Sequence, residues 1–143
     1  MGITAELAEF VATVPSGGIP DEVRHQAVRA LVNWVACALG GATDSTVQTA
    51  WESIRELAGA PQATVIGRAQ RVDAAHAALL NGISSHVLDF DDTHLETLVH
   101  PSGPVFSALA ALAQIREING REWMDAAVLG MEAECRIAQG LGK

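Results

Sequence analysis

Apolar residues recur every three or four positions along most of this chain, and this spacing limits the possible folds more than any other feature of the sequence. Such a repeat places apolar side chains on one face of an α-helix. The longest example follows Pro20 and consists of Val23, Ala27, Leu31, Trp34, Val35, Ala38 and Leu39. Comparable patterns predict further helices that begin near Thr4, Asp44, Asp73, Ser102 and Glu122. The helices from Asp44 and Ser102 are expected to end near Ala58 and Ile118.

Only one short segment has the composition of a β-strand, residues 63–67 with the sequence ATVIG. A single isolated strand does not form a sheet. We therefore predict an all-α fold, a bundle of about six helices with at most this one short strand. The length of 143 residues suits a single helical domain over residues 1–143. Because no polar tail follows the last helix, we expect a truncated N-terminal part of a longer two-domain protein.

The charge balance excludes several classes of partner. The chain has a net charge of −8 and nine lysine and arginine residues in total, which argues against binding to nucleic acid or to an anionic membrane surface. No run of about 18 apolar residues predicts a membrane span. Cys37 and Cys135 are far apart and suit reduced thiols in a cytoplasmic protein. The start of the chain lacks the pattern of an export signal.

Ionisable residues concentrate in the stretch SSHVLDFDDTHLETLVHPSGP, residues 84–104. If the preceding helix continues through it, His86, Asp89 and Thr93 share one helix face. His100 precedes a proline and is expected in a loop that can fold back towards them. The first amides of the next helix and Ser102 could receive a substrate carboxylate. This arrangement favours proton transfer on an organic acid.

Two other chemistries are compatible with parts of this stretch. Possible metal ligands are Asp89, Asp91, Asp92, His94, Glu96 and His100, although their spacing fits neither an EF-hand nor an H-E-x-x-H site. The run VLDFDDTH is similar to the D-x-D-x-T motif of a class of phosphatases, with Asp89 as the nucleophile. Such a phosphatase needs Asp89 at the end of a buried parallel strand, and the preceding NGISSH has a poor composition for a strand. The phosphatase therefore stays a less favoured alternative.

The longer run NGISSHVLDFDDTH…HPSGPV, within this order of helices, resembles the MmgE/PrpD family. The segments ATVIG…AAHAALLNG and NGREWMDAAVLGMEAECRI fit the same pattern, so the resemblance covers nearly the whole chain. It implies a cytoplasmic homodimer with a helical main domain and a smaller α+β domain. It also implies lyase or isomerase chemistry on small di- and tricarboxylates, without a metal or other cofactor.

The resemblance extends to individual positions. It implies that Asp89, Thr93 and His100 are the catalytic residues. We expect four further residues to bind substrate, namely His86, Asp92, His94 and Ser102. Arg68 and Arg71 are the local candidates for pairing with a substrate carboxylate, with surface salt bridges as the alternative.

The expected reaction is like that of 2-methylcitrate dehydratase in propionate catabolism, in which a proton next to a carboxylate is removed and water is lost. The family places a further histidine, a lysine and a tyrosine later in a longer chain. This sequence has no tyrosine, and its lysine is residue 143, so we expect the 143 residues alone to be inactive. The alternative from another class is a non-catalytic helical module, derived from the family, that dimerises.

Overall fold

The computed structural model describes residues 2–14 and 18–141, and over these residues the chain is mostly helical, as predicted. The six helices are α1 (Ile3–Thr13), α2 (Asp21–Gly41), α3 (Ser45–Ile54), α4 (Ala74–His86), α5 (Ser102–Leu112) and α6 (Gly120–Leu141). The two short strands are β1 (Ala63–Thr64) and β2 (Arg71–Val72). None of the described helices combines the length and hydropathy needed to cross a membrane.

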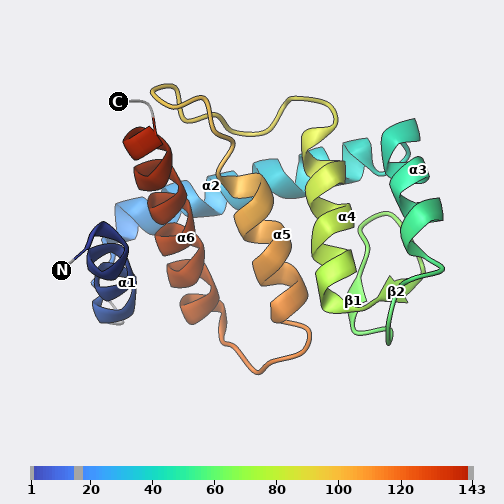
Figure 1. The fold of residues 1–143 in the computed structure, drawn as a ribbon, viewed down its shortest axis with the longest axis horizontal. Helices are drawn as coiled ribbons and strands as arrows, with labels where there is room; N and C mark the ends of the chain where they lie inside the picture. Colours follow the sequence, from blue (N-terminus) through green and yellow to red (C-terminus); the bar gives the residue numbers. More distant parts are fainter. Residues whose placement is uncertain (1, 15–17, 142–143) are drawn as a thin grey trace.

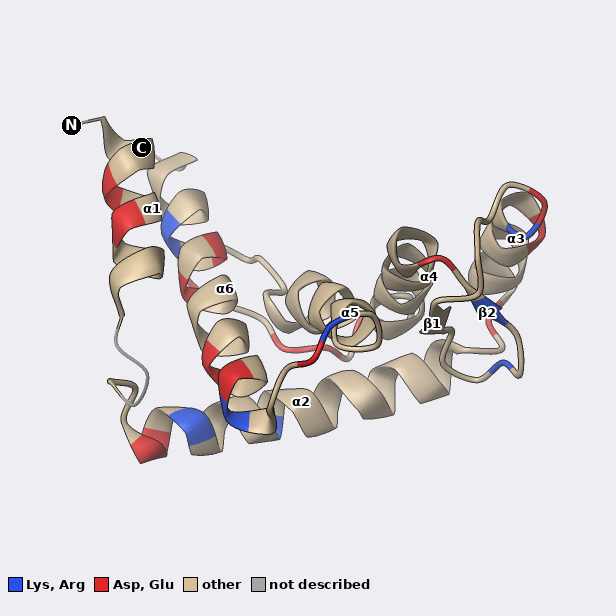
Figure 2. Ribbon diagram, turned by 90° about the horizontal axis from the view of Figure 1, so that it is seen from below, with Lys and Arg blue, Asp and Glu red and all other residues tan. Residues whose placement is uncertain are grey.

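Helices α4, α5 and α6 stand side by side across the long helix α2 (Figures 1 and 2). Helix α3 packs against α4 at one end of this row, and α1 lies beside α6 at the other. Neither α4 nor α5 contains an Asp, Glu, Lys or Arg residue (Figure 2). These two uncharged helices pack against each other at the centre of the row, and the acidic loop that joins them runs along one end of it.

The predicted strand is shorter than expected and has a partner. Ala63 pairs with Val72 and Thr64 with Arg71 in a small antiparallel sheet. The chain reverses between the strands through Gly67, whose φ of 79° is easily adopted only by glycine. Asn81 of α4 secures the segment, because its side chain bonds the carbonyl of Thr64 and the amide of Ile66. The pattern of residues 63–67 thus indicated a strand correctly, but its partner has no comparable sequence signal.

Two hydrophobic clusters form the core. One lies between α3, α4 and the strands and is centred on Trp51, Val65 and Leu80. The other joins α2, α5 and α6 through Trp34, Phe106 and Ala127. The indole N–H of Trp34 donates to the hydroxyl of Ser107 at 3.0 Å, so its polar atom is satisfied inside the core.

Helix α2 buries only part of its predicted apolar repeat. Ala27, Trp34 and Ala38 are buried, whereas Val35 and Leu39 are exposed. The reason is geometric, since α4, α5 and α6 cover one side of α2 and leave the other open (Figure 2). Two predicted helix ends also differ, because α3 ends at Ile54 rather than near Ala58 and α5 ends at Leu112 rather than near Ile118.

Helices α2 and α4 approach most closely near the start of the acidic loop. A Cβ atom on Gly41 would lie 2.1 Å from the carbonyl oxygen of Ser84, so only glycine permits this distance. The hydroxyl of Ser84 also donates to the carbonyl of Ala38 at 2.6 Å. The C-terminal turn of α4, which carries His86, is therefore held firmly against α2.

Candidate active site

Helix α4 ends at His86, where the candidate site begins. Val87 is the C-cap, and Asp89 adopts a left-handed conformation with φ of 55°. Aspartate enters this region more readily than most residues. The condition under which His86, Asp89 and Thr93 would share one helix face, a helix that continues through this stretch, is therefore not met. The reversal at Asp89 instead directs the chain back so that Asp91 contacts His86.

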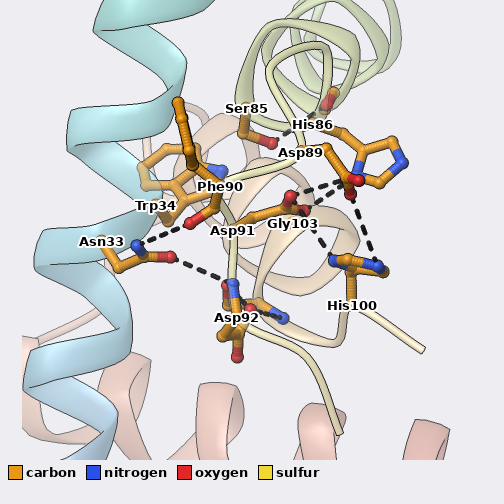
Figure 3. Close-up of polar contacts among 12 residues, drawn as sticks. Asn33, Trp34, Ser85, His86, Asp89, Phe90, Asp91, Asp92, His100 and Gly103 are labelled. Carbon is orange, nitrogen blue, oxygen red and sulfur yellow. Dashed lines mark hydrogen bonds and ion pairs between the residues drawn. The ribbon is translucent and has the colours of Figure 1, made fainter. Parts of the chain in front are cut away.

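One side chain of α2, Asn33, anchors this reversed segment (Figure 3). Its amide nitrogen donates to the carbonyl of Phe90, and its oxygen accepts from the backbone N–H of Asp92, both at 3.1 Å. Asn33 lies 57 residues before Phe90 in the chain. This role could not be predicted from the sequence, because a single asparagine on a helix has no distinguishing local pattern.

Four ionisable side chains converge in this region, namely His86, Asp89, Asp91 and His100 (Figure 3). Nδ1 of His86 lies 3.1 and 3.0 Å from the two carboxylate oxygens of Asp91. Nδ1 of His100 is 3.5 Å from Oδ1 of Asp91, and its Nε2 is 3.9 Å from Oδ1 of Asp89. The two imidazole rings meet edge to face, with centroids 4.8 Å apart.

Exposure separates the two carboxylates of the cluster. The Asp91 side chain is 1% exposed, whereas that of Asp89 is 80% exposed. His86 and His100 are intermediate, at 57% and 26%. Asp91 is thus the buried carboxylate of the cluster, and Asp89 is the carboxylate that is accessible to a ligand from solvent.

A cavity of about 290 Å³ adjoins the cluster. Its lining comprises Gly82, His86, Asp91, His100, Gly103 and Pro104. A larger groove of about 780 Å³ lies between α1 and α6, but its lining is mainly apolar, and its charged groups are Glu6 and Arg136. The smaller cavity is the better candidate for acid–base chemistry because two imidazoles and a carboxylate line it.

Three of the predicted site residues therefore come together, namely Asp89, His100 and His86. Thr93 is exposed. His94 bonds instead to the hydroxyl of Thr97, at 2.7 Å from its Nδ1, and pairs with Val99 in a β-bridge. The expectation for His94 came from the family motif, and that for Thr93 came from the motif and from a shared helix face that the chain does not form here.

Asp92 and Ser102 contact each other. Both the backbone N–H and the hydroxyl of Ser102 donate to Oδ1 of Asp92. Ser102 is fully buried, so its donors satisfy Asp92 instead of standing free for a substrate carboxylate, as the sequence had suggested. This pair fixes the start of α5 to the acidic loop and thereby fixes His100, which is two residues earlier.

Cations are scarce around the cluster. Within residues 2–14 and 18–141, the ion pairs of Asp89 and Asp91 are with histidines and not with arginine or lysine. Arg68 stacks over the ring of Trp51, and Arg71 donates to the carbonyl of Gln62, so both local candidates are engaged elsewhere. On α6, burial raises the pKa of the Glu134 carboxyl, and the negative charge of Asp92 adds to this effect.

The same four side chains are of the types that bind divalent transition metals. One ligand atom from each of His86, Asp89, Asp91 and His100 lies within 4.8 Å of the others. This set differs from the metal ligands considered from the sequence, because His86 joins it. Asp92 and His94 are bonded to Ser102 and Thr97, and Glu96 accepts from Gln139 of α6.

The phosphatase interpretation does not fit this geometry. It requires Asp89 directly after a buried parallel strand. In the described structure Asp89 follows α4, and the sheet is a two-stranded antiparallel one that lies beyond the other end of that helix. The match to D-x-D-x-T is therefore limited to the short sequence motif, and the fold that the motif requires is not present around Asp89.

Known relatives match the chain over nearly its whole length. It is 27% identical to the cis-aconitate decarboxylase-like protein oryM of Aspergillus oryzae over 97% of this chain and 30% of the relative. It is 28% identical to human cis-aconitate decarboxylase over 94% of this chain and 29% of that protein. A shorter match to mouse cis-aconitate decarboxylase has 42% identity over 52% of this chain and 16% of the relative. The chain thus spans at most about 30% of the length of these relatives.

The sequence profile of the MmgE/PrpD N-terminal domain matches residues 5–143. That match includes every helix from α2 to α6 and the whole His–Asp cluster. The resemblance inferred from the acidic stretch is therefore confirmed, and the chain belongs to the MmgE/PrpD family.

Proposed function

We propose that this chain supplies proton-transfer groups to a lyase that acts on small di- or tricarboxylates. The main support is the convergence of His86, Asp89 and His100, of which the two histidines line one cavity. Imidazoles and carboxylates are the usual general acids and bases of enzymes. Family membership supports the substrate class, since the relatives described above are named as decarboxylases of a tricarboxylate.

In this proposal, His100 and Asp89 exchange a proton with a carbon next to a substrate carboxylate. Nε2 of His100 and Oδ1 of Asp89 are 3.9 Å apart, too far for a mutual hydrogen bond. Both atoms are therefore available to a substrate that binds at the exposed side of Asp89. The carbanion formed by such a step is enolate-like, and its stabilisation is expected to supply much of the reduction in barrier.

Two overall reactions use this proton transfer. In dehydration, which we predicted from the motif, the base removes a proton from carbon and water leaves from the neighbouring carbon. In decarboxylation, carbon dioxide leaves first and an acid then protonates the same type of carbon. The names of the relatives favour decarboxylation of cis-aconitate. Dehydration of 2-methylcitrate is the second candidate, because the motif resemblance implied it.

Electrostatics limits what the described residues do alone. A tricarboxylate needs cations to bind, whereas the cluster contains two aspartates and the chain has a net charge of −8. We propose that the cations belong to further residues of a complete family-type enzyme, because the chain spans at most about 30% of its relatives. A cytoplasmic homodimer and a second domain are parts of the same proposal.

The test is a product assay on the native gene product, isolated at the length that its source expresses. It is incubated separately with cis-aconitate and 2-methylcitrate, and products are identified by mass spectrometry. We expect loss of 44 Da from the first or loss of 18 Da from the second, these being roughly the masses of carbon dioxide and water. Asp89→Asn is expected to reduce the rate about 100-fold or more. Absence of both products would contradict the proposal.

A non-catalytic dimerisation module stays as the second candidate because α2 presents an uncovered apolar face. Val28, Val32 and Leu39 are 44%, 64% and 58% exposed. They follow one another at intervals of four and seven residues, so they share one side of the helix. This candidate predicts that Val32→Asp shifts the sedimentation coefficient from dimer to monomer, and that tricarboxylates do not raise Tm. The lyase proposal predicts that they do raise Tm of the complete enzyme.

A further inference from the structure

Asp91 stands out because it is buried between two histidines and was not among the residues that the motif pointed to. Its side chain is 1% exposed. Both of its carboxylate oxygens face Nδ1 of His86, at 3.0 and 3.1 Å (Figure 3). Among the described residues its ion pairs are with histidines, so no arginine or lysine compensates its charge. A carboxylate buried in this way must be bonded to proton donors to be tolerated.

The two histidines are not equivalent partners of Asp91. Nδ1 of His86 is at hydrogen-bonding distance from the carboxylate, whereas Nδ1 of His100 is 3.5 Å away and makes no hydrogen bond. An ionised carboxylate can only accept hydrogen bonds. Nδ1 of His86 must therefore carry a proton, and in the neutral imidazole the lone pair is then on Nε2.

His86 is also placed to use that lone pair. Its ring lines the cavity of about 290 Å³ together with His100. Its side chain is 57% exposed, so the edge of the ring opposite Asp91 is accessible. Figure 3 shows the second ring nitrogen on the far side of His86 from Asp91. The buried carboxylate, the imidazole and the cavity thus follow one another in the order found in Asp–His pairs that transfer protons.

We propose that Asp91 is a positioning residue that fixes His86 as the Nδ1–H tautomer and thereby makes Nε2 of His86 a second proton-transfer atom. The identity of the substrate rests on the proposed function, but the tautomer does not. In dehydration, Nε2 takes a proton from a substrate carbon, the C–H electron pair forms the new carbon–carbon double bond, and the imidazolium gives the proton to the departing hydroxide as water. In decarboxylation, the imidazolium gives its Nε2 proton to the carbanion that forms when carbon dioxide leaves. Asp91 stabilises the imidazolium in both reactions.

The test is a two-bond ¹H–¹⁵N correlation spectrum of the ¹⁵N-labelled gene product, at the length that its source expresses. It is recorded near pH 8.5, about two units above the ordinary imidazole pKa of about 6.5. His86→Gln identifies the signals of His86. We expect the pattern of an Nδ1–H tautomer for His86. An Nε2–H pattern in the wild-type chain would overturn the proposal, and this result needs neither a substrate nor a second variant.

Asp91→Asn provides the complementary test, since its amide can donate to Nδ1 of His86. The Nδ1–H population of His86 is expected to fall, while the signals of His76, which pairs with Asp73, stay unchanged. An unchanged His86 pattern in a folded variant would contradict the role of Asp91. If the lyase assay succeeds, Asp91→Asn should lower kcat about 100-fold with little change in KM. A merely structural role predicts a lower Tm with kcat per folded molecule retained.

Discussion

The two ends of helix α4 carry the same chemical pair in different settings. At the N-terminus, Oδ2 of Asp73 lies 2.6 Å from Nδ1 of His76. At the C-terminus, the corresponding contact between Asp91 and His86 measures 3.0 Å. The residues are of the same kinds and the ring atom is the same, so the difference between the two ends lies in what else each carboxylate contacts.

The carboxylate of Asp73 accepts hydrogen bonds from backbone amides as well as from a side chain. Besides His76 it accepts from the amides of Gly59 and of His76 itself, and it is the N-cap of α4. The bond to the His76 side chain, followed by that to Gly59, holds the pKa of the Asp73 carboxyl well below its usual range. All these partners belong to the fold, which makes this pair structural.

In the part of the chain that the structure describes, Asp91 has no such backbone bonds, and its partners are side chains that line a cavity. The nearby Asp89 has a left-handed backbone, the kind of local strain that often accompanies a functional site. An Asp–His contact alone therefore does not identify an active site. What distinguishes the second pair is a buried carboxylate whose histidine still has one nitrogen exposed.

The largest expected effect is on activity, and it distinguishes His100, in the cluster at the C-terminal end of α4, from His76 at the N-terminal end. In the active gene product, His100→Gln is expected to lower kcat about 100- to 10,000-fold, the usual contribution of a general acid or base. His76→Gln is the matched control and should leave kcat within about twofold. Steady-state kinetics with the product assay measures both. Equal losses in the two variants would remove the functional distinction between the ends of α4.

The next effect is on stability, and it tests whether the C-terminal end of α4, which carries the candidate site, needs close packing against α2. Gly41→Ala places a methyl group 2.1 Å from the carbonyl oxygen of Ser84. We expect a loss of about 1–3 kcal/mol or more in the free energy of unfolding, measured with urea, because backbone has to move. Gly40→Ala is the control, since its methyl group would meet only the side-chain end of Leu88, at 3.3 Å. Equal losses in both variants would contradict this packing.

A smaller effect concerns the Asp73–His76 pair at the N-terminal end of α4, whose contribution to stability depends on pH. The folded-state pKa of Asp73 is lowered, so its contribution to stability is present above the unfolded pKa of about 3.9 and is lost as the pH falls towards the folded value. Asp73→Asn should therefore lower Tm by several degrees near neutral pH and by less below about pH 4. A Tm difference that stays constant across this range, in thermal scans followed by circular dichroism, would contradict the proposed pairing.

The smallest effect concerns the anchor of the acidic loop. Asn33→Ala removes the hydrogen bonds to Phe90 and Asp92. We expect a cost of about 1 kcal/mol, together with faster hydrogen exchange at the Asp92 amide. The amide of Ile66, held by Asn81, should exchange as in the wild type and serves as the internal control. Unchanged exchange at Asp92 would mean that Asn33 does not hold the loop.

Local patterns predicted most of the fold. The N-caps Asp44 and Asp73 and the apolar repeats located helices α3 and α4 at the correct starting residues. Contacts between distant segments were beyond such patterns, including the pairing of β1 with β2 and the exposure of Val35 on α2. Periodicity shows that a face is apolar, but not which neighbours cover it.

The candidate site was predicted in outline for a similar reason. The motif pointed to Asp89 and His100, which do converge. It missed Asp91 and Asn33, because their roles depend on the reversal at Asp89, and aspartates occur with positive φ only occasionally. Assuming an unbroken helix grouped Thr93 with His86 and Asp89, whereas the further carboxylate of the observed cluster is that of Asp91.

The most direct test of a proton-transfer site at this end of α4 is deuterium exchange at carbon. The gene product is incubated with cis-aconitate in D₂O, and deuterium in the decarboxylation product is measured by mass spectrometry. We expect deuterium at the carbon next to a carboxylate with the wild type and with His76→Gln, and little or none with His100→Gln. Undiminished incorporation with His100→Gln, or none with the wild type, would contradict the assignment of this cluster as the active site.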